Sequence, residues 1–201
     1  GGKIFITNVG EAGILNLTAR VIEGDEDKGI GAFIIETNTP VLIINPKEKK
    51  MGWCASDTRQ IFFEDMAVPA KNMLGTPGIG FKTFLKTLTG GRISIAALSA
   101  SLALGVYFCA LNNTTEGKAF GKVIHKPRAI GNKLADMATE IEAAKLLTFH
   151  AAWMKDQGLD IQKEAAMAKL FSSETAMRTT TEAIQIHGGY GYVKEYDVER
   201  Y

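Results

Sequence analysis

Three glycines fall within four positions near the end of the chain, in the stretch AIQIHGGYGYVKE at residues 183–195. They follow a run that has the pattern of a long helix. One glycine in the left-handed conformation, such as Gly188, is enough to end a helix, so Gly189 and Gly191 are surplus for that purpose. Glycine beside exposed backbone N–H groups is what the close approach of a phosphate or a sugar requires. On local pattern alone, a helix end and a ligand-facing turn are equally good interpretations.

The rest of the sequence contains few groups with a catalytic spacing. The histidines His125, His150 and His187 are scattered, and no HExxH, GxSxG or Walker A motif occurs. The cysteines Cys54 and Cys109 lie far apart in apolar settings without a CxxC partner, which predicts buried free thiols and no metal site. A formal net charge of +1 argues against a nucleic-acid partner. No run of about 18 uninterrupted apolar residues occurs, which argues against a membrane span.

The first part of the chain has the pattern of strands. Residues 1–74 contain short runs rich in Ile, Val, Phe and Thr, separated by turn signals such as EGDEDKG and TNTP. The runs are KIFIT, LNLTARVI, GAFIIET, VLII and QIFFEDMAV. No strand–helix alternation is present, so we expect a small antiparallel β-barrel or sandwich domain over 1–74.

The second part has the pattern of helices. The sequence predicts helices over about 80–113, 129–158 and 161–189. Long helices joined by short loops favour an up-and-down bundle. We therefore expect a multi-domain α+β protein, in which an up-and-down four-helix-bundle domain at 75–201 follows the β domain.

Several motifs, in order along the chain, resemble the acyl-CoA dehydrogenase family of flavoproteins, with the short-chain or butyryl branch most similar. They are FITN, KGIGAFIIETNTPVL, KMGWCASDTRQIFFEDMAVPAKNMLG, GFKTFLKTLTGGRISIAALS, KAFGK, KLADMATEIEAAKLLTFHAA, KEAAMAKLFSSETA and AIQIHGGYGYVKEYDVERY. The resemblance covers essentially all 201 positions. It implies a middle β domain and most of a C-terminal bundle, and the chain is expected to be a fragment without the family's N-terminal helical domain and the tail of its bundle.

The resemblance also implies an activity. Members of the family oxidise an acyl-CoA thioester to the trans-2-enoyl-CoA: a glutamate removes the α proton, the β hydrogen leaves as hydride to N5 of FAD, and the electrons pass to an electron-transferring flavoprotein. A dry cleft with donors on the thioester carbonyl suits this chemistry. The usual base is expected beyond Tyr201, so no catalytic residue is assigned within the chain and the fragment alone is expected to be inactive. The parent is expected to be a homotetramer, in the mitochondrial matrix of a eukaryote or the cytoplasm of a bacterium.

The cofactor residues follow by resemblance. One group resembles the strand along the isoalloxazine ring, with an aromatic face and a hydroxyl near N5: Phe5, Ile6 and Thr7. A second group resembles the segment that receives the ADP part of FAD, usually from a neighbouring subunit: Gln185, Ile186, His187, Gly188 and Gly189. Phe120 resembles another cofactor contact. The stretch expected to touch acyl-CoA is Thr89, Gly90, Gly91 and Arg92.

Some positions depart from the family pattern. The family commonly has an Arg that pairs with the FAD pyrophosphate where Gly117 stands, Gln where Arg128 stands and Asp where Thr89 stands. The alternative base found in one branch is replaced by Gly91. These departures predict loose FAD binding, with Arg128 substituting in part for the missing Arg. They leave open a degenerate binding or scaffold homologue, and an acyl-CoA oxidase is a further alternative.

Overall fold

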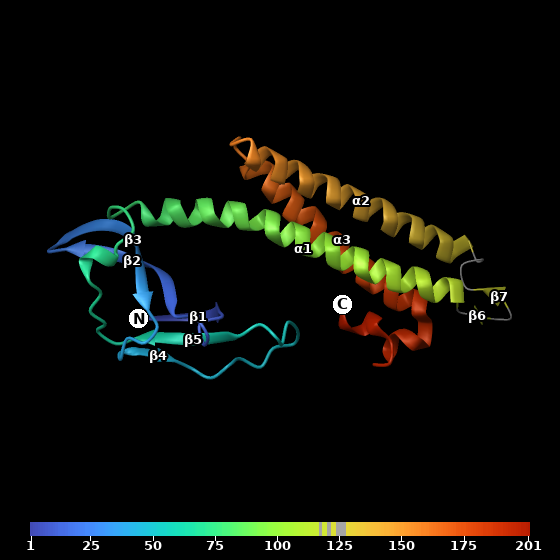
Figure 1. Cartoon of the computed structure of the whole chain (residues 1–201), viewed down its shortest axis with the longest axis horizontal. Helices are drawn as coiled ribbons and strands as arrows, with labels where there is room; N and C mark the ends of the chain where they lie inside the picture. The colour runs from blue at the N-terminus through green and yellow to red at the C-terminus, as the bar shows by residue number, and fades with distance from the viewer. Residues whose placement is uncertain (117, 120–121, 124–127) are drawn as a thin grey trace. The chain divides into compact units, whose positions relative to one another are not determined.

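The computed structural model describes residues 1–116, 118–119, 122–123 and 128–201 (Figure 1). The chain divides into two compact units, Gly1–Leu85 and Lys86–Tyr201. Each unit is described by itself.

The first unit is built from short antiparallel strands. They are β1 (Gly2–Thr7), β2 (Ile14–Glu23), β3 (Glu26–Glu36), β4 (Leu42–Ile44) and β5 (Thr58–Phe63). One sheet has the order β1-β5-β4, and β2 and β3 form a separate hairpin (Figure 1). Gly24, with φ of +59°, turns the chain between β2 and β3, as the EGDEDKG signal predicts. The antiparallel pairing is as predicted, but the sheets do not close, so the barrel is not confirmed.

The core of the first unit fixes the end of β1. Val9, Leu42 and Ile61 are buried, and Ile6 packs against them. The chain continues through a short 3₁₀ helix, η1 (Ala70–Asn72), before the first long helix begins. The Ile6 side chain therefore anchors β1 to this core, while Phe5 and Thr7 on either side of it are exposed.

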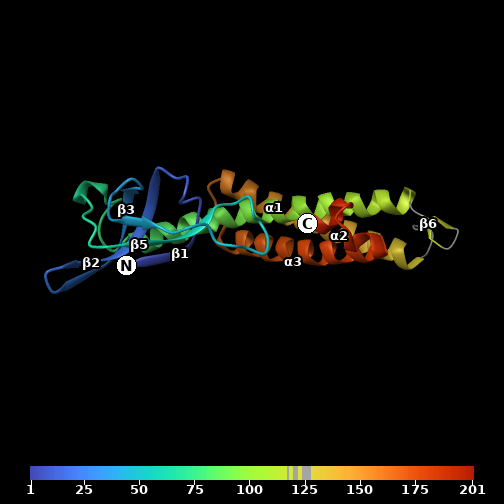
Figure 2. The same ribbon diagram turned by 90° about the horizontal axis from the view of Figure 1, so that it is seen from below.

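The second unit is helical. The described part of the chain contains three long helices, α1 (Gly80–Glu116), α2 (Arg128–Asp156) and α3 (Gln162–His187). Two-residue strands β6 (Lys118–Ala119) and β7 (Lys122–Val123) pair between α1 and α2, and 3₁₀ helices η2 (Gly188–Tyr192) and η3 (Asp197–Arg200) follow α3. Figures 1 and 2 both show the three long helices side by side, so the predicted helical domain is confirmed. Its three helices are the three that the sequence predicts, and the fourth helix of a bundle stays a prediction.

Small side chains form the contacts between these helices. Ala96 of α1 packs with Ala151 of α2 and Ala168 of α3, and Ala103 packs with Ile141 and Ala176. The large apolar residues that reveal the helical period lie mostly outside: Leu146, Phe149, Met167, Leu170, Met177 and Ile184 are exposed. Small residues let helix backbones approach closely, so alanine, serine and threonine dominate the buried face of α3, whereas α2 also buries Leu134, Met137 and Ile141.

Helix α1 has an unusual composition for an amphipathic helix. Over Gly80–Thr115 it is long and apolar enough to cross a membrane, judged by length and composition alone. A core helix of a globular protein passes the same test, and the buried alanines of α1 pack on α2 and α3. The expected absence of a membrane span stays a prediction.

Candidate cofactor site

The three glycines after α3 have three different roles. Gly188 has φ of +60° and its N–H donates to the carbonyl of Gln185, which ends the helix. Gly189 is exposed, and no atom lies within 4 Å of the position that a Cβ would occupy. Gly191 is buried, and a Cβ there would lie 2.6 Å from the carbonyl oxygen of Ile184. The first two glycines thus leave an accessible backbone, while the third closes the chain onto α3.

The residues before the turn divide by exposure. Gln185 is exposed, whereas Ile186 and His187 are buried at 4% and 6%. Ile186 belongs to a core cluster that includes Val106 of α1 and Val198 of η3. A ligand at the surface of this turn can therefore reach the Gln185 side chain and the backbone of Gly188–Gly189, but not the buried Ile186 side chain.

The proposed flavin strand presents one strained aromatic residue. Phe5 has φ of +58° at an irregularity in the pairing of β1 with β5, and its side chain is 67% exposed. A positive φ is a rare and costly conformation for a bulky residue, and such strain concentrates at functional sites. Thr7 is exposed, while Ile6 faces the core. Within the Phe5–Thr7 stretch, the side chains available to a ligand are thus Phe5 and Thr7.

A charged cluster fixes the turn that follows β1. The Asp57 carboxylate accepts the Gly10 amide at 2.9 Å and the Arg59 guanidinium at 2.9 Å, and its own carbonyl accepts the Asn8 amide at 2.8 Å. Burial opposes ionisation of Asp57, but the Gly10 amide and Arg59 outweigh it and hold the pKa of Asp57 below its usual value.

The predicted substrate stretch lies inside α1. Gly91 is exposed with no neighbouring atom near its Cβ position, and Gly90 lies near the Lys155 ammonium, 3.5 Å from its Cβ position. Arg92 is half-buried and has no ion pair within the part of the chain that the structure describes. It lines a shallow hollow of about 570 Å³ together with Asp160, Gln162, Lys163, Ala166 and Lys169. Thr89 is half-buried in the same helix.

Three predicted cofactor residues fall, in the sequence, between the end of α1 and the first residue of α2. Gly117 and Phe120 fall outside the described residues. Arg128 is the first residue of α2 and is exposed, without an ion-pair partner among residues 1–116 and 128–201. Its guanidinium is available for an external anion.

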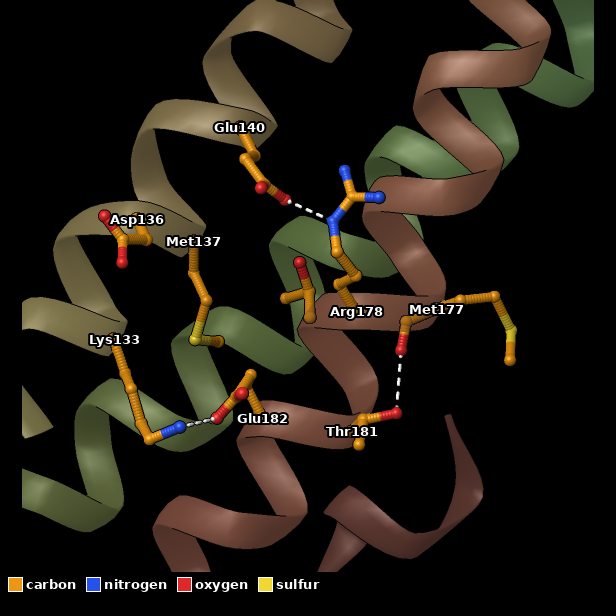
Figure 3. A pocket seen from close by; sticks show the side chains of 9 residues that line it. Lys133, Asp136, Met137, Glu140, Met177, Arg178, Thr181 and Glu182 are labelled. Atoms are coloured by element: carbon orange, nitrogen blue, oxygen red, sulfur yellow. Dashed lines mark hydrogen bonds and ion pairs between the residues drawn. The ribbon is translucent and has the colours of Figure 1, made fainter.

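A second hollow, of about 510 Å³, opens between α2 and α3 (Figure 3). Two ion pairs cross it: Lys133 with Glu182, and Arg178 with Glu140 at 3.0 Å. The sequence shows these residues only as charged helix faces, since nothing in the helical period reveals a pairing between helices. Because each cation already has a carboxylate partner, these ion pairs leave no unpaired cation for an anionic ligand.

The two cysteines differ in exposure. Both are free, and Cys54 is exposed, so the predicted burial is wrong for it because its loop lies on the surface; Cys109 is half-buried. The described residues contain no group of three or more His, Cys, Asp or Glu side chains placed to hold a metal ion.

Comparison with known proteins identifies the family. The acyl-CoA dehydrogenase C-terminal domain matches residues 78–201. The chain belongs to the acyl-CoA dehydrogenase family. It is 49% identical over 201 residues to a probable acyl-CoA dehydrogenase, YngJ, of Bacillus subtilis, and 44% identical to the mitochondrial short-chain specific acyl-CoA dehydrogenase of Bos taurus. The predicted resemblance is confirmed.

Solved structures agree with this assignment. Butyryl-CoA dehydrogenase from Megasphaera elsdenii superposes with a TM-score of 0.94 at 46% identity, covering 100% of this chain and 52% of the other. A structure from a study of the electron-transferring flavoprotein of Acidaminococcus fermentans superposes equally well at 44% identity, covering 100% of this chain and 53% of the other. The chain spans about half the length of the curated relatives it matches, 53% and 49% for the two named. The acyl-CoA dehydrogenase family consists of FAD flavoproteins. An FAD complex of PigA, which is 29% identical to this chain, superposes with a TM-score of 0.92, covering 100% of this chain and 52% of PigA.

Proposed function

We propose that this chain is part of an FAD-dependent acyl-CoA dehydrogenase that converts an acyl-CoA thioester to the trans-2-enoyl-CoA. The observation that carries the proposal is the exposed Gly188–Gly189 backbone at the end of α3, in a chain of this family. When bound, FAD would supply the hydride acceptor, a redox capacity that no side chain has.

The residues present fit a dinucleotide. Gly189 has no side chain and no neighbour near its Cβ position, so its backbone N–H can approach a phosphate or a sugar oxygen. The exposed Gln185 amide adds a neutral donor and acceptor beside it. Arg128 adds a guanidinium without an ion partner in the described chain, suited to a pyrophosphate. We propose that these groups hold the ADP part of FAD, with Gly117 and Phe120 as further contacts.

The residues of β1 suit the isoalloxazine ring. Phe5 is exposed and strained, so its ring can lie against a flat aromatic face. The Thr7 hydroxyl is exposed two residues later and can donate to a ring nitrogen. We propose that Phe5 and Thr7 contact the flavin through their side chains and that Ile6 contributes only its backbone.

The proposed substrate is a short acyl-CoA. Arg92 is the cation of the Thr89–Arg92 stretch, and neighbouring lysines add positive charge to the hollow it lines. An electropositive hollow attracts a phosphate-bearing substrate. We propose that this stretch contacts the acyl-CoA.

We also propose that the boundary between the middle β domain and the helical bundle lies between residues 74 and 75.

We further propose that the parent protein passes its electrons to an electron-transferring flavoprotein and is a homotetramer. The family relationship and the Acidaminococcus fermentans structure support the electron acceptor. Relatives occur in bacteria and in mitochondria. We therefore propose the cytoplasm for a bacterial source and the mitochondrial matrix for a eukaryotic one.

Turnover of the full-length protein tests the function. With butyryl-CoA and electron-transferring flavoprotein, we expect enoyl-CoA to form at the rate at which the acceptor is reduced. A protein that binds FAD but leaves butyryl-CoA unchanged contradicts the proposal and supports the scaffold alternative. Stoichiometric oxygen consumption without the acceptor supports the oxidase instead.

A further inference from the structure

His187 stands next to the proposed cofactor turn but faces away from it. Its imidazole is 6% exposed, and Nδ1 lies 2.8 Å from the carbonyl oxygen of Ala183, one turn earlier in α3. A carbonyl oxygen can only accept, so Nδ1 must carry a proton. In the neutral ring the proton is therefore on Nδ1, and Nε2 is the acceptor.

The same ring supports the segment that folds back after the glycines. The His187 and Tyr196 rings meet edge to face, with centroids 6.1 Å apart and an angle of 74°. Tyr196 in turn lies against Tyr190, with centroids 5.1 Å apart. Tyr196 also packs against the core cluster that contains Val198. His187 is thus one link between the last turn of α3 and the returning chain, beside the contact of Ile186 with the cluster that contains Val198.

The first two glycines of the turn differ from His187 in exposure. Gly188 and Gly189 are exposed and have no atom within 4 Å of their Cβ positions. Gly191 is pressed against Ile184, which fixes the far end of the turn. A peptide with several glycines has many conformations of similar energy, so an accessible backbone at Gly189 needs fixed flanks to be preorganised for a ligand.

We propose that His187 is a positioning residue for the cofactor turn: it holds Gly188 and Gly189 in their binding conformation through Ala183 and Tyr196, without its side chain touching the cofactor. This inference rests on the proposed function, in which the turn receives the ADP part of FAD. It assigns the side chain a role that a Leu of similar size cannot fill, because Leu has no N–H to donate.

The test compares FAD dissociation constants of full-length variants. We expect His187→Leu to weaken binding about tenfold, the effect of one lost hydrogen bond of about 1.4 kcal/mol. His187→Asn should restore most of the affinity, because the Asn amide nitrogen occupies the place of Nδ1 along the side chain. His150→Leu, at an exposed histidine of α2, is the matched control and should bind as the wild type does.

A second readout does not depend on FAD. Hydrogen exchange of the apoprotein should accelerate at residues 188–193 in His187→Leu and return to the wild-type rate in His187→Asn. If His187→Leu does not fold, Tyr196→Leu and Tyr196→Phe provide the same comparison, since only the first removes the ring. Equal FAD affinity and equal exchange for His187→Leu and wild type overturn the positioning role.

The failure of the inference can be told apart from the failure of the proposed function. Gly189→Val places a branched side chain on the exposed backbone without touching His187. If Gly189→Val weakens FAD binding but His187→Leu does not, only the positioning role is wrong. If neither variant changes FAD binding, the turn does not receive the cofactor and both proposals are wrong.

Discussion

Alanine substitution of the three glycines after α3 should produce three different losses of stability. At Gly191 an added Cβ lies 2.6 Å from the Ile184 carbonyl oxygen, whereas an ordinary contact begins at 3.4 Å, so the overlap is about 0.8 Å. The carbonyl belongs to a helix and the glycine is buried, so neither atom can move without a backbone shift. Overpacking of this kind costs about 1–3 kcal/mol.

The other two glycines are internal comparisons for Gly191. Gly188 has open space at its Cβ position but φ of +60° and ψ of −133°, a combination that residues with a Cβ rarely adopt, so Gly188→Ala should cost about 1–3 kcal/mol from backbone strain alone. Gly189 has open space and no positive φ, so Gly189→Ala should change stability by less than about 0.5 kcal/mol.

Urea unfolding of wild type and the three variants, followed by circular dichroism, measures these losses. The losses at Gly191 and at Gly188 should both exceed the loss at Gly189. Equal losses at Gly189 and Gly191 would falsify the assignment of separate roles, because neither position has a positive φ and only Gly191 is buried with a backbone atom close to the added carbon.

Three further predictions concern the rest of the chain. The Gly10 amide and Arg59 hold the Asp57 pKa low against the effect of burial. The Asp57 carboxylate therefore stabilises the fold above about pH 4, and this contribution is lost as pH falls through its folded pKa. Asp57→Asn should flatten the acid limb of a curve of unfolding free energy against pH, and an unchanged limb contradicts the contact. Burial and the neighbouring Cys109 raise the Tyr201 pKa above 10.0. The contribution of the Tyr201 phenol to stability is therefore present below pH 10 and is lost as pH rises through the folded pKa. Ultraviolet titration of wild type against Tyr201→Phe should show one late-titrating phenol, and a phenol that titrates normally refutes the contact. Ala168 is fully buried between helices, so Ala168→Leu should destabilise the protein by about 1–3 kcal/mol in urea unfolding; a neutral result means that the helices are not closely packed there.

The element types could be predicted from the sequence because their periods are strong. The strand runs of residues 1–74 and the three helical stretches appear at nearly the predicted bounds. The sheet arrangement could not be predicted, because pairing of β1 with β5 joins residues about sixty positions apart and no local signal specifies it.

The buried face of α3 shows why periodicity is not enough. Met167, Leu170 and Met177 mark the helical period, yet they are exposed, while Ala168 and Thr175 are buried. Large apolar residues predict a buried face only where helices are spaced to accommodate them, and here the close contacts select small side chains.

The candidate site was predictable in part. The two surplus glycines after α3 indicated an exposed backbone. Gly189 lies in the open as expected, whereas Gly191 is buried against Ile184, so the expectation is wrong for Gly191. The strained backbone of Phe5 could not be predicted, because it lies at an irregularity in the pairing of β1 with β5. The inward orientation of His187 could not be predicted either, because it depends on the contact with Tyr196. The roles of these residues toward FAD stay predictions.

The central claim is that the bare backbone at Gly189 receives FAD, and titration of full-length apoprotein with FAD by flavin fluorescence tests it most directly. Gly189→Val is compared with Gly52→Val, another exposed glycine with no atom near its Cβ position. We predict that Gly189→Val raises the FAD dissociation constant about 10- to 100-fold, as loss of a hydrogen bond to a charged group does, and that Gly52→Val leaves it unchanged. Equal dissociation constants for wild type and both variants contradict the claim.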